Sequence, residues 1–130
     1  MRRSLLLIVA IVGSVLTSHL YADEPKGADI AFAENIIDLG VVAQEDDKQH
    51  LRLSFSNTGD VPLVITEVRT SCSCTTIKYD RKPVLPGQSG VLNITVDPQK
   101  APKGHFYRVL QVYSTAKSGV QNITLKAEIE

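Results

Sequence analysis

The sequence predicts an all-β fold, an immunoglobulin-like antiparallel β-sandwich of about seven to eight strands. Three observations support this prediction. After residue 29, apolar and polar side chains alternate with a period of two, turn-forming residues interrupt this pattern every ten or so residues, and no amphipathic helical pattern stands out. A chain of 130 residues, of which 43% are apolar, is long enough for one domain with its own core.

The N-terminal segment has the pattern of a secretory signal peptide. Arg2 and Arg3 precede an apolar run from Leu5 to Leu16, and these 12 residues are too few for a membrane span, which needs about 20. The stretch from Thr17 to Ala22 follows this run, and we expect cleavage after Ala22.

The chain therefore divides into a signal peptide helix over residues 1–22, a polar leader over 23–29 and the sandwich domain over 30–130. We expect a periplasmic or secreted protein that makes no membrane contact after signal cleavage. Loss of the two arginines leaves a mature net charge of −2, which offers no electrostatic basis for binding nucleic acid.

Each candidate strand is a short run with strand-like composition between turn signals. The eight runs are Ile30–Phe32, Ile36–Val42, Gln49–Ser56, Leu63–Arg69, Thr75–Tyr79, Gly90–Val96, Phe106–Ser114 and Val120–Ile129. Alternation is clearest in the third run, where Leu51, Leu53 and Phe55 share one face. The tyrosines at positions 79, 107 and 113 are expected to be half-buried strand residues.

Turn residues separate these runs. The segment Asn57–Asp60 contains Asn57 and Gly59, which tolerate positive φ, and Pro62 then ends the ladder. Pro86 and Gly87 suit the two central positions of a type II turn.

These motifs resemble a secreted bacterial family of domains of unknown function. The resemblance rests on an N-T-G turn at Asn57–Gly59, a C-x-C motif at Cys72–Cys74 and a P-G turn at Pro86–Gly87, in this order. The family is similar to the abnormal-spindle and Hydin-like (ASH) immunoglobulin-like domains. The resemblance implies an immunoglobulin-like sandwich in the cell envelope, and it implies no reaction.

Cys72 and Cys74 are the only two cysteines. In an exported protein they favour a disulfide, but an extended segment would place the two Cα atoms about 6.6–6.8 Å apart, at the upper limit of disulfide geometry, so that closing the bond requires a kink. Two thiolates on one face also suit Cu(I), and a zinc site would need His50 and His105 to converge on them. A thiol for exchange with a partner, or a buried one, is the remaining interpretation.

No catalytic constellation is found. Lys100, Lys103 and Arg108 form no basic patch in the sequence, and the acidic run Glu45–Asp47 is interpreted as a solvated loop. We predict a non-enzymatic binding or structural module of the envelope, which presents loops or an edge strand to an unknown envelope protein. The alternative is a thiol-redox or copper-handling protein that uses Cys72 and Cys74.

Overall fold

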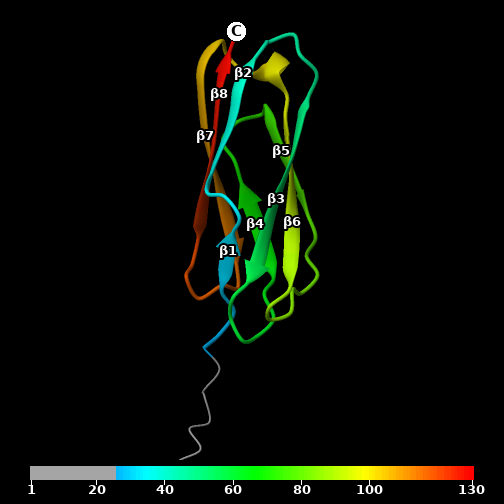
Figure 1. Ribbon diagram of the computed structural model, residues 1–130, viewed down its shortest axis with the longest axis vertical. Coiled ribbons are helices and arrows are strands. Elements are labelled where there is room, and N and C mark those ends of the chain that lie inside the picture. Colours follow the sequence, from blue (N-terminus) through cyan, green and yellow to red (C-terminus); the bar gives the residue numbers. More distant parts are fainter. Residues whose placement is uncertain (1–25) are drawn as a thin grey trace, which may run out of the picture.

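Two four-stranded sheets packed face to face confirm the predicted sandwich (Figure 1). The computed structural model describes residues 26–130, so the predicted signal peptide lies outside the described residues. One sheet has the order β1-β3-β6-β5 and the other β2-β8-β7-β4. The strands are β1 (Ile30–Phe32), β2 (Ile36–Val42), β3 (Gln49–Asn57), β4 (Ile65–Arg69), β5 (Thr75–Tyr79), β6 (Ser89–Val96), β7 (Gly104–Ser114) and β8 (Gln121–Ile129). A short 3-10 helix, η1 (Pro98–Lys100), precedes β7.

The core lies between the sheets and follows the period-two alternation of the strands. Leu92 of β6, Leu110 of β7 and Leu125 of β8 have no exposed surface, whereas their sequence neighbours face outward or are only partly buried. The predicted inward face of β3 is also confirmed, since Leu53 and Phe55 are buried. This alternation, readable in the sequence, orients both sheets.

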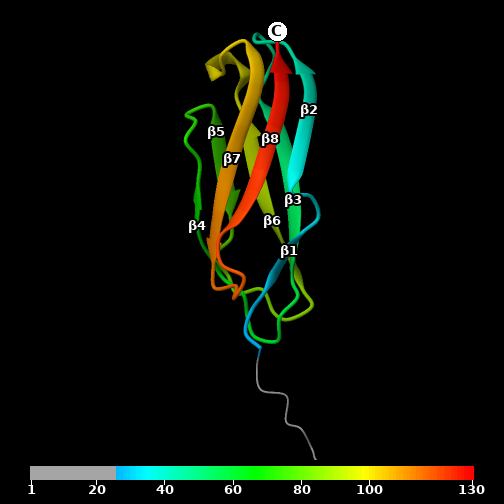
Figure 2. The ribbon, with the colours of Figure 1, turned by 90° about the vertical axis from the view of Figure 1, so that its left-hand side faces the viewer.

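One pairing departs from the antiparallel prediction. The chain changes sheets between β1 and β2, so that β1 pairs antiparallel with β3 while β2 pairs parallel with β8 (Figure 2). A β-bulge interrupts β2 between Asp38 and Val41, with Gly40 at a φ of 70° and its amide donating to the Asp38 carboxylate. The extra residue turns Val41 outward and Val42 into the core.

The P-G turn and the N-T-G turn require their glycines for different physical reasons. At the P-G turn, Gly87 has a φ of 77° and the Gln88 amide donates to the Leu85 carbonyl, as in a type II turn. In the N-T-G turn no residue has a positive φ, which corrects the reason inferred from the sequence. A Cβ on Gly59 would instead collide with the Gly27 carbonyl, so the glycine is required by close approach of two backbones.

Asn57 is buried and organises this end of the sandwich. Its Oδ1 accepts hydrogen bonds from the amides of Gly59 and Asp29, and its Nδ2 donates to the carbonyls of Val61 and Val84. Pro62 is exposed just before Leu63, which forms an isolated bridge to Val84. Strand β4 therefore begins at Ile65, two residues later than predicted.

The last residues of the predicted leader contact the sandwich through a carboxylate clamp. The Asp60 carboxylate accepts hydrogen bonds from the amides of Lys26 at 2.7 Å and Gly27 at 2.9 Å, and the Thr58 amide donates to the backbone carbonyl of Asp29. The hydrogen bond from the Lys26 amide is the largest cause that lowers the pKa of Asp60, and the hydroxyl of Ser118 lowers the pKa of Asp29 in the same way.

These two lowered pKa values predict that stability falls in acid. Because each folded-state pKa lies below its unfolded value near 3.8, the stabilisation is fully present above that value and is lost as pH falls through the folded pKa. Denaturant titrations between pH 7 and pH 3 should show a smaller acid loss for Asp60→Asn, which is also less stable at pH 7. Asp47→Asn, in the exposed loop before β3, is the control, and an unchanged acid profile for Asp60→Asn would contradict the clamp.

Candidate functional site

Strand β7 is paired along most of its length on one side but over only four residues on the other. Strand β8 pairs with it from Gly104 to Val112, whereas β4 pairs only with Gln111–Ser114. After Arg69 the chain leaves the sheet and crosses to β5, diverging from β7 as Figure 2 shows. Within residues 26–130, no strand covers the other side of Gly104–Leu110, which we call the free edge of β7.

The pairing pattern shows which backbone groups lie along this free edge. The Thr124 amide donates to Asn35, toward β2, and Thr124 is the residue opposite Val109. In an antiparallel ladder, pairs of opposite residues that exchange backbone hydrogen bonds alternate with pairs whose N–H and C=O groups point away from each other. Val109 therefore directs its N–H and C=O away from β8, and so do Tyr107 and His105, two and four positions earlier.

The side chain of Arg108 covers part of the free edge. Its Nη1 donates to the Tyr107 carbonyl at 2.8 Å, and its guanidinium lies 5.0 Å from the centre of the Phe106 ring. A charged side chain that covers an unpaired carbonyl is a known protection of an exposed strand edge. Tyr107 itself is 58% exposed, which corrects the expectation that it is half-buried.

A surface hollow of about 370 Å³ lies where β4 ends. Arg69, Thr70 and Ser71 line it on one side, and Val109 and Gln111 on the other. The Arg69 guanidinium lies 4.6 Å from the centre of the Tyr113 ring and forms an ion pair with Glu67 at 3.0 Å. The hollow joins the free edge to a polar wall that includes the Arg69 guanidinium, which is paired with Glu67.

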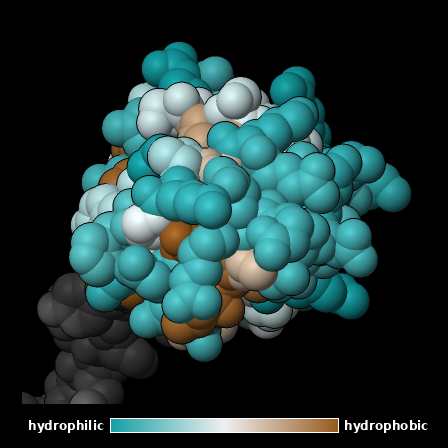
Figure 3. Space-filling view, turned by 90° about the horizontal axis from the view of Figure 1, so that it is seen from above, coloured by the Kyte–Doolittle hydropathy of each residue, from teal (hydrophilic) through white to brown (hydrophobic). Residues whose placement is uncertain are grey.

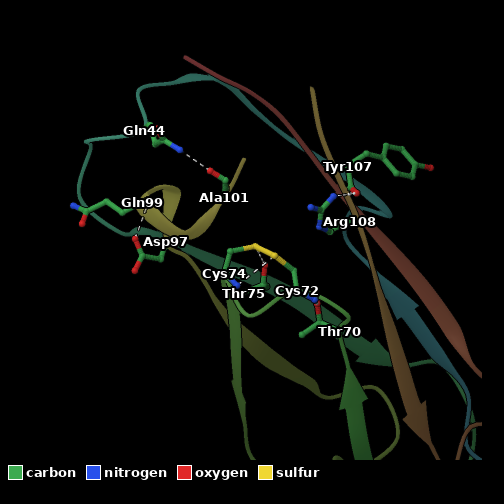
Figure 4. The surroundings of a disulfide bond; sticks show 10 residues. All are labelled: Gln44, Thr70, Cys72, Cys74, Thr75, Asp97, Gln99, Ala101, Tyr107 and Arg108. Atoms are coloured by element: carbon green, nitrogen blue, oxygen red, sulfur yellow. Dashed lines mark hydrogen bonds between the residues drawn. A yellow bond between two sulfur atoms is a disulfide. The ribbon is translucent and has the colours of Figure 1, made fainter. Parts of the chain in front are cut away.

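The wall of this hollow continues into the cysteine loop, which Figure 4 shows between the two sheets. Cys72 and Cys74 are joined in a disulfide, with their Cα atoms 5.2 Å apart. The Thr75 amide donates to the Cys72 carbonyl at 3.3 Å, which closes a turn over residues 72–75. This turn is the kink that the sequence required, and in the disulfide form neither sulfur is a thiolate that could bind Cu(I).

This disulfide contributes little to the stability of the fold. The loop that it closes contains three residues, and loop-closure entropy for such a loop is about 1.6 kcal/mol. The residues that bridge β4 and β5 are already held by backbone bonds, including that from the Asp97 amide to the Cys74 carbonyl at 2.7 Å. Stability alone is therefore a weak reason for this pair of cysteines.

The histidines considered as metal ligands do not join the cysteines. His50 lies on β3 and hydrogen-bonds the hydroxyl of Thr95, while His105 lies on β7 of the other sheet and pairs with Glu128 at 2.7 Å. Both imidazoles are on outward-facing positions. Within residues 26–130, no group of three metal-ligating side chains is found.

No pattern in the sequence predicts the free edge. The sequence predicts the runs that form β4 and β7, but their relative register, which leaves seven residues of β7 uncovered, depends on pairing between distant segments. Arg108 looked like one of three scattered basic residues. In the described part of the chain, no helix has the length and apolar character needed to cross a membrane.

Similar solved structures share the fold. A protein of unknown function from Porphyromonas gingivalis W83 is 23% identical, with a TM-score of 0.70 over 78% of this chain and 46% of that protein. The ASH/PapD-like domain 7 of human CEP192 is 8% identical, with a TM-score of 0.66 over 82% of this chain and 89% of that domain. The periplasmic chaperone SfaE is 12% identical, with a TM-score of 0.57 over 78% of this chain and 58% of that protein.

These identities support a shared fold of the immunoglobulin and PapD type and no more. The chain spans less than half the length of the Porphyromonas protein. No curated protein matches the sequence. A model of a protein family does match it, over residues 30–129, which is nearly all of the sandwich. The chain belongs to this family, DUF1573, described as a protein family of unknown function.

Proposed function

We propose that the chain is an exported, non-enzymatic protein-binding module that takes up an extended segment of an envelope protein along the free edge of β7. The family and the chaperone-like fold support a binding or structural module. The uncovered length of β7 supports strand addition, in which main-chain hydrogen bonds supply affinity and side-chain pockets supply specificity.

The other sheet edges offer fewer regularly paired residues to an added strand. β1 has three residues, β5 has five with Lys78 exposed, and β4 has five with a register shift after Ile65. β2 is longer, but its bulge breaks the ladder after Asp38. The free edge of β7 provides seven consecutive residues without an irregularity in their pairing to β8.

The end of the sandwich that carries the C-terminus is a poorer surface for a protein partner than the free edge of β7. Figure 3 shows the end that carries the C-terminus, where most of the surface is hydrophilic and apolar residues occur in small separate areas. An incoming strand on β7 would lie beside the hollow at Val109 and Gln111 and within reach of Arg69. An acidic or hydroxyl side chain on the partner segment fits this polar wall.

A proline at Tyr107 tests strand addition. Because the Tyr107 N–H faces the free edge, Tyr107→Pro removes no hydrogen bond to β8 but blocks an added strand. We expect partner binding to weaken at least about tenfold, the equivalent of roughly one lost hydrogen bond and a steric clash. Tyr107→Val is the matched control, since it removes the ring and retains the N–H.

Binding is measured by photo-crosslinking in cells that make the protein naturally. A benzoylphenylalanine in place of Val109 should crosslink a protein, and Tyr107→Pro should abolish this product while Tyr107→Val preserves it. The same probe at Thr76, on the edge of the other sheet, is the positional control. Crosslinking that is insensitive to Tyr107→Pro in a variant with unchanged circular dichroism would refute binding at this edge.

A further inference from the structure

We infer that the Cys72–Cys74 disulfide is a thiol-exchange site, in which an external thiolate attacks the sulfur of Cys72 and Cys74 is the leaving group. This activity goes beyond the proposed binding function and does not depend on it. Three features of the cysteine loop carry the inference: the unequal exposure of the two cysteines, a hydrogen-bond donor at each sulfur, and the location of the pair in a short crossover.

The two cysteines differ in accessibility. Cys74 begins the approach to β5 and is 2% exposed, whereas Cys72 is only partly buried and follows the exposed Ser71. An external thiolate must reach a sulfur along the S–S axis, so access decides which sulfur is attacked. The exposed flank of the loop makes Cys72 the electrophilic sulfur.

Each sulfur also has a hydrogen-bond donor that would stabilise it as a thiolate. The Thr75 Oγ1 lies 3.5 Å from the Cys74 Sγ, and because a disulfide sulfur carries no hydrogen, the hydroxyl is the donor. The Cys74 amide lies 3.3 Å from the Cys72 Sγ and donates to it. Hydrogen bonds to the charged form lower a thiol pKa and favour its departure.

A cationic side chain completes these surroundings. Arg108 of β7 is among the residues drawn around the disulfide in Figure 4, and the residue as a whole is partly buried. A nearby cation favours thiolates and attracts the anionic attacking thiol. Neither the backbone of β4 nor that of β5 has to separate from its sheet for the bond to open, since the loop lies between the two strands.

The reductant is a thiol, and a dithiol completes the cycle. The first thiolate of the dithiol forms a bond with the Cys72 sulfur. The Cys72–Cys74 bond breaks at the same time, and its electron pair goes to the Cys74 sulfur, which takes up a proton. The second thiolate of the dithiol then attacks the dithiol sulfur that is bonded to Cys72, which forms the dithiol's disulfide and releases Cys72. The dithiol is oxidised by two electrons and the cysteine pair is reduced by two.

The asymmetry is tested with single-cysteine variants of the folded protein. Cys74→Ala leaves only Cys72, and Cys72→Ala leaves only Cys74. With oxidised glutathione at pH 7, we expect Cys72 to form the mixed disulfide at least about ten times faster than Cys74, as measured by mass after acid quenching. Equal rates, or a faster reaction at Cys74, would overturn the assignment.

The donor role is tested in the two-cysteine protein. Thr75→Val removes the hydroxyl at the Cys74 sulfur, and Thr76→Val makes the same change at an exposed neighbour. Loss of one hydrogen bond should slow reduction of the disulfide about fivefold in Thr75→Val and leave Thr76→Val unchanged. Equal rates in the two variants would remove Thr75 from the exchange step.

Small thiols and protein dithiols share this chemistry, and an experiment with two reductants distinguishes between them. Reduction of the native protein is followed by alkylation and mass with glutathione in one arm and reduced thioredoxin in the other. Reduction in either arm supports exchange, and the faster arm assigns the source of the thiol. A disulfide that resists both until the protein is denatured refutes the inference, whereas crosslinking at Val109 would be unaffected by this result.

Discussion

Replacement of Asn57 by alanine is expected to lower the free energy of unfolding by about 3–5 kcal/mol. The side chain is 1% exposed and makes four hydrogen bonds to backbone groups of three separate segments. Alanine leaves these groups without partners in a place that water does not fill readily, and each buried unpaired group costs about 1–3 kcal/mol. Guanidinium denaturation at pH 7 measures the change.

Two variants sharpen this prediction. Asn57→Asp keeps the oxygen that accepts from Gly59 but loses the donors to Val61 and Val84, so it should be destabilised as well. Asn93→Ala, at an exposed position of β6, should change stability by less than about 0.5 kcal/mol. If Asn57→Ala is as mild as Asn93→Ala, the loop does not depend on this side chain.

Truncation of Leu92 to alanine is expected to cost about 2–5 kcal/mol, because it opens a cavity between the sheets. Leu92 is fully buried on β6 and lies opposite Leu53 of β3 and Tyr79 of β5 in the strand register. The rigid ladders on both sides limit how far the surrounding residues can relax into the space. The change is measured by the same denaturation experiment.

The control for this core prediction is the same truncation at the surface. Leu85 precedes the P-G turn and is 49% exposed, so Leu85→Ala should cost less than about 1 kcal/mol. Similar losses in the two variants would mean that the sandwich does not pack around β6 as described.

The strands could be predicted from the sequence because their signal is local. Alternation along Leu51, Leu53 and Phe55 fixes both the strand and its inward face, and the proline and glycine at 86 and 87 fix the turn before β6. Three runs, including those that became β1 and β5, have the predicted bounds without any shift.

Local signals failed where two alternatives had the same composition. Val41 and Val42 are both apolar, so only the bulge in β2 decides that Val41 is 66% exposed and Val42 is 4% exposed. Likewise, the N-T-G turn looked like a site of positive φ, but the requirement for Gly59 arises from residues about thirty positions earlier in the chain.

Local patterns along the chain were enough to predict the fold class, the inward faces of the central strands and the pair of cysteines. Three features follow from contacts in the folded chain: β2 runs parallel to β8, β4 ends early against β7, and Cys72 and Cys74 meet in a turn between the sheets. The two groups differ in the range of the interactions that produce them. Alternation and turn chemistry act between adjacent residues, whereas a free edge exists only through the register of strands about forty residues apart.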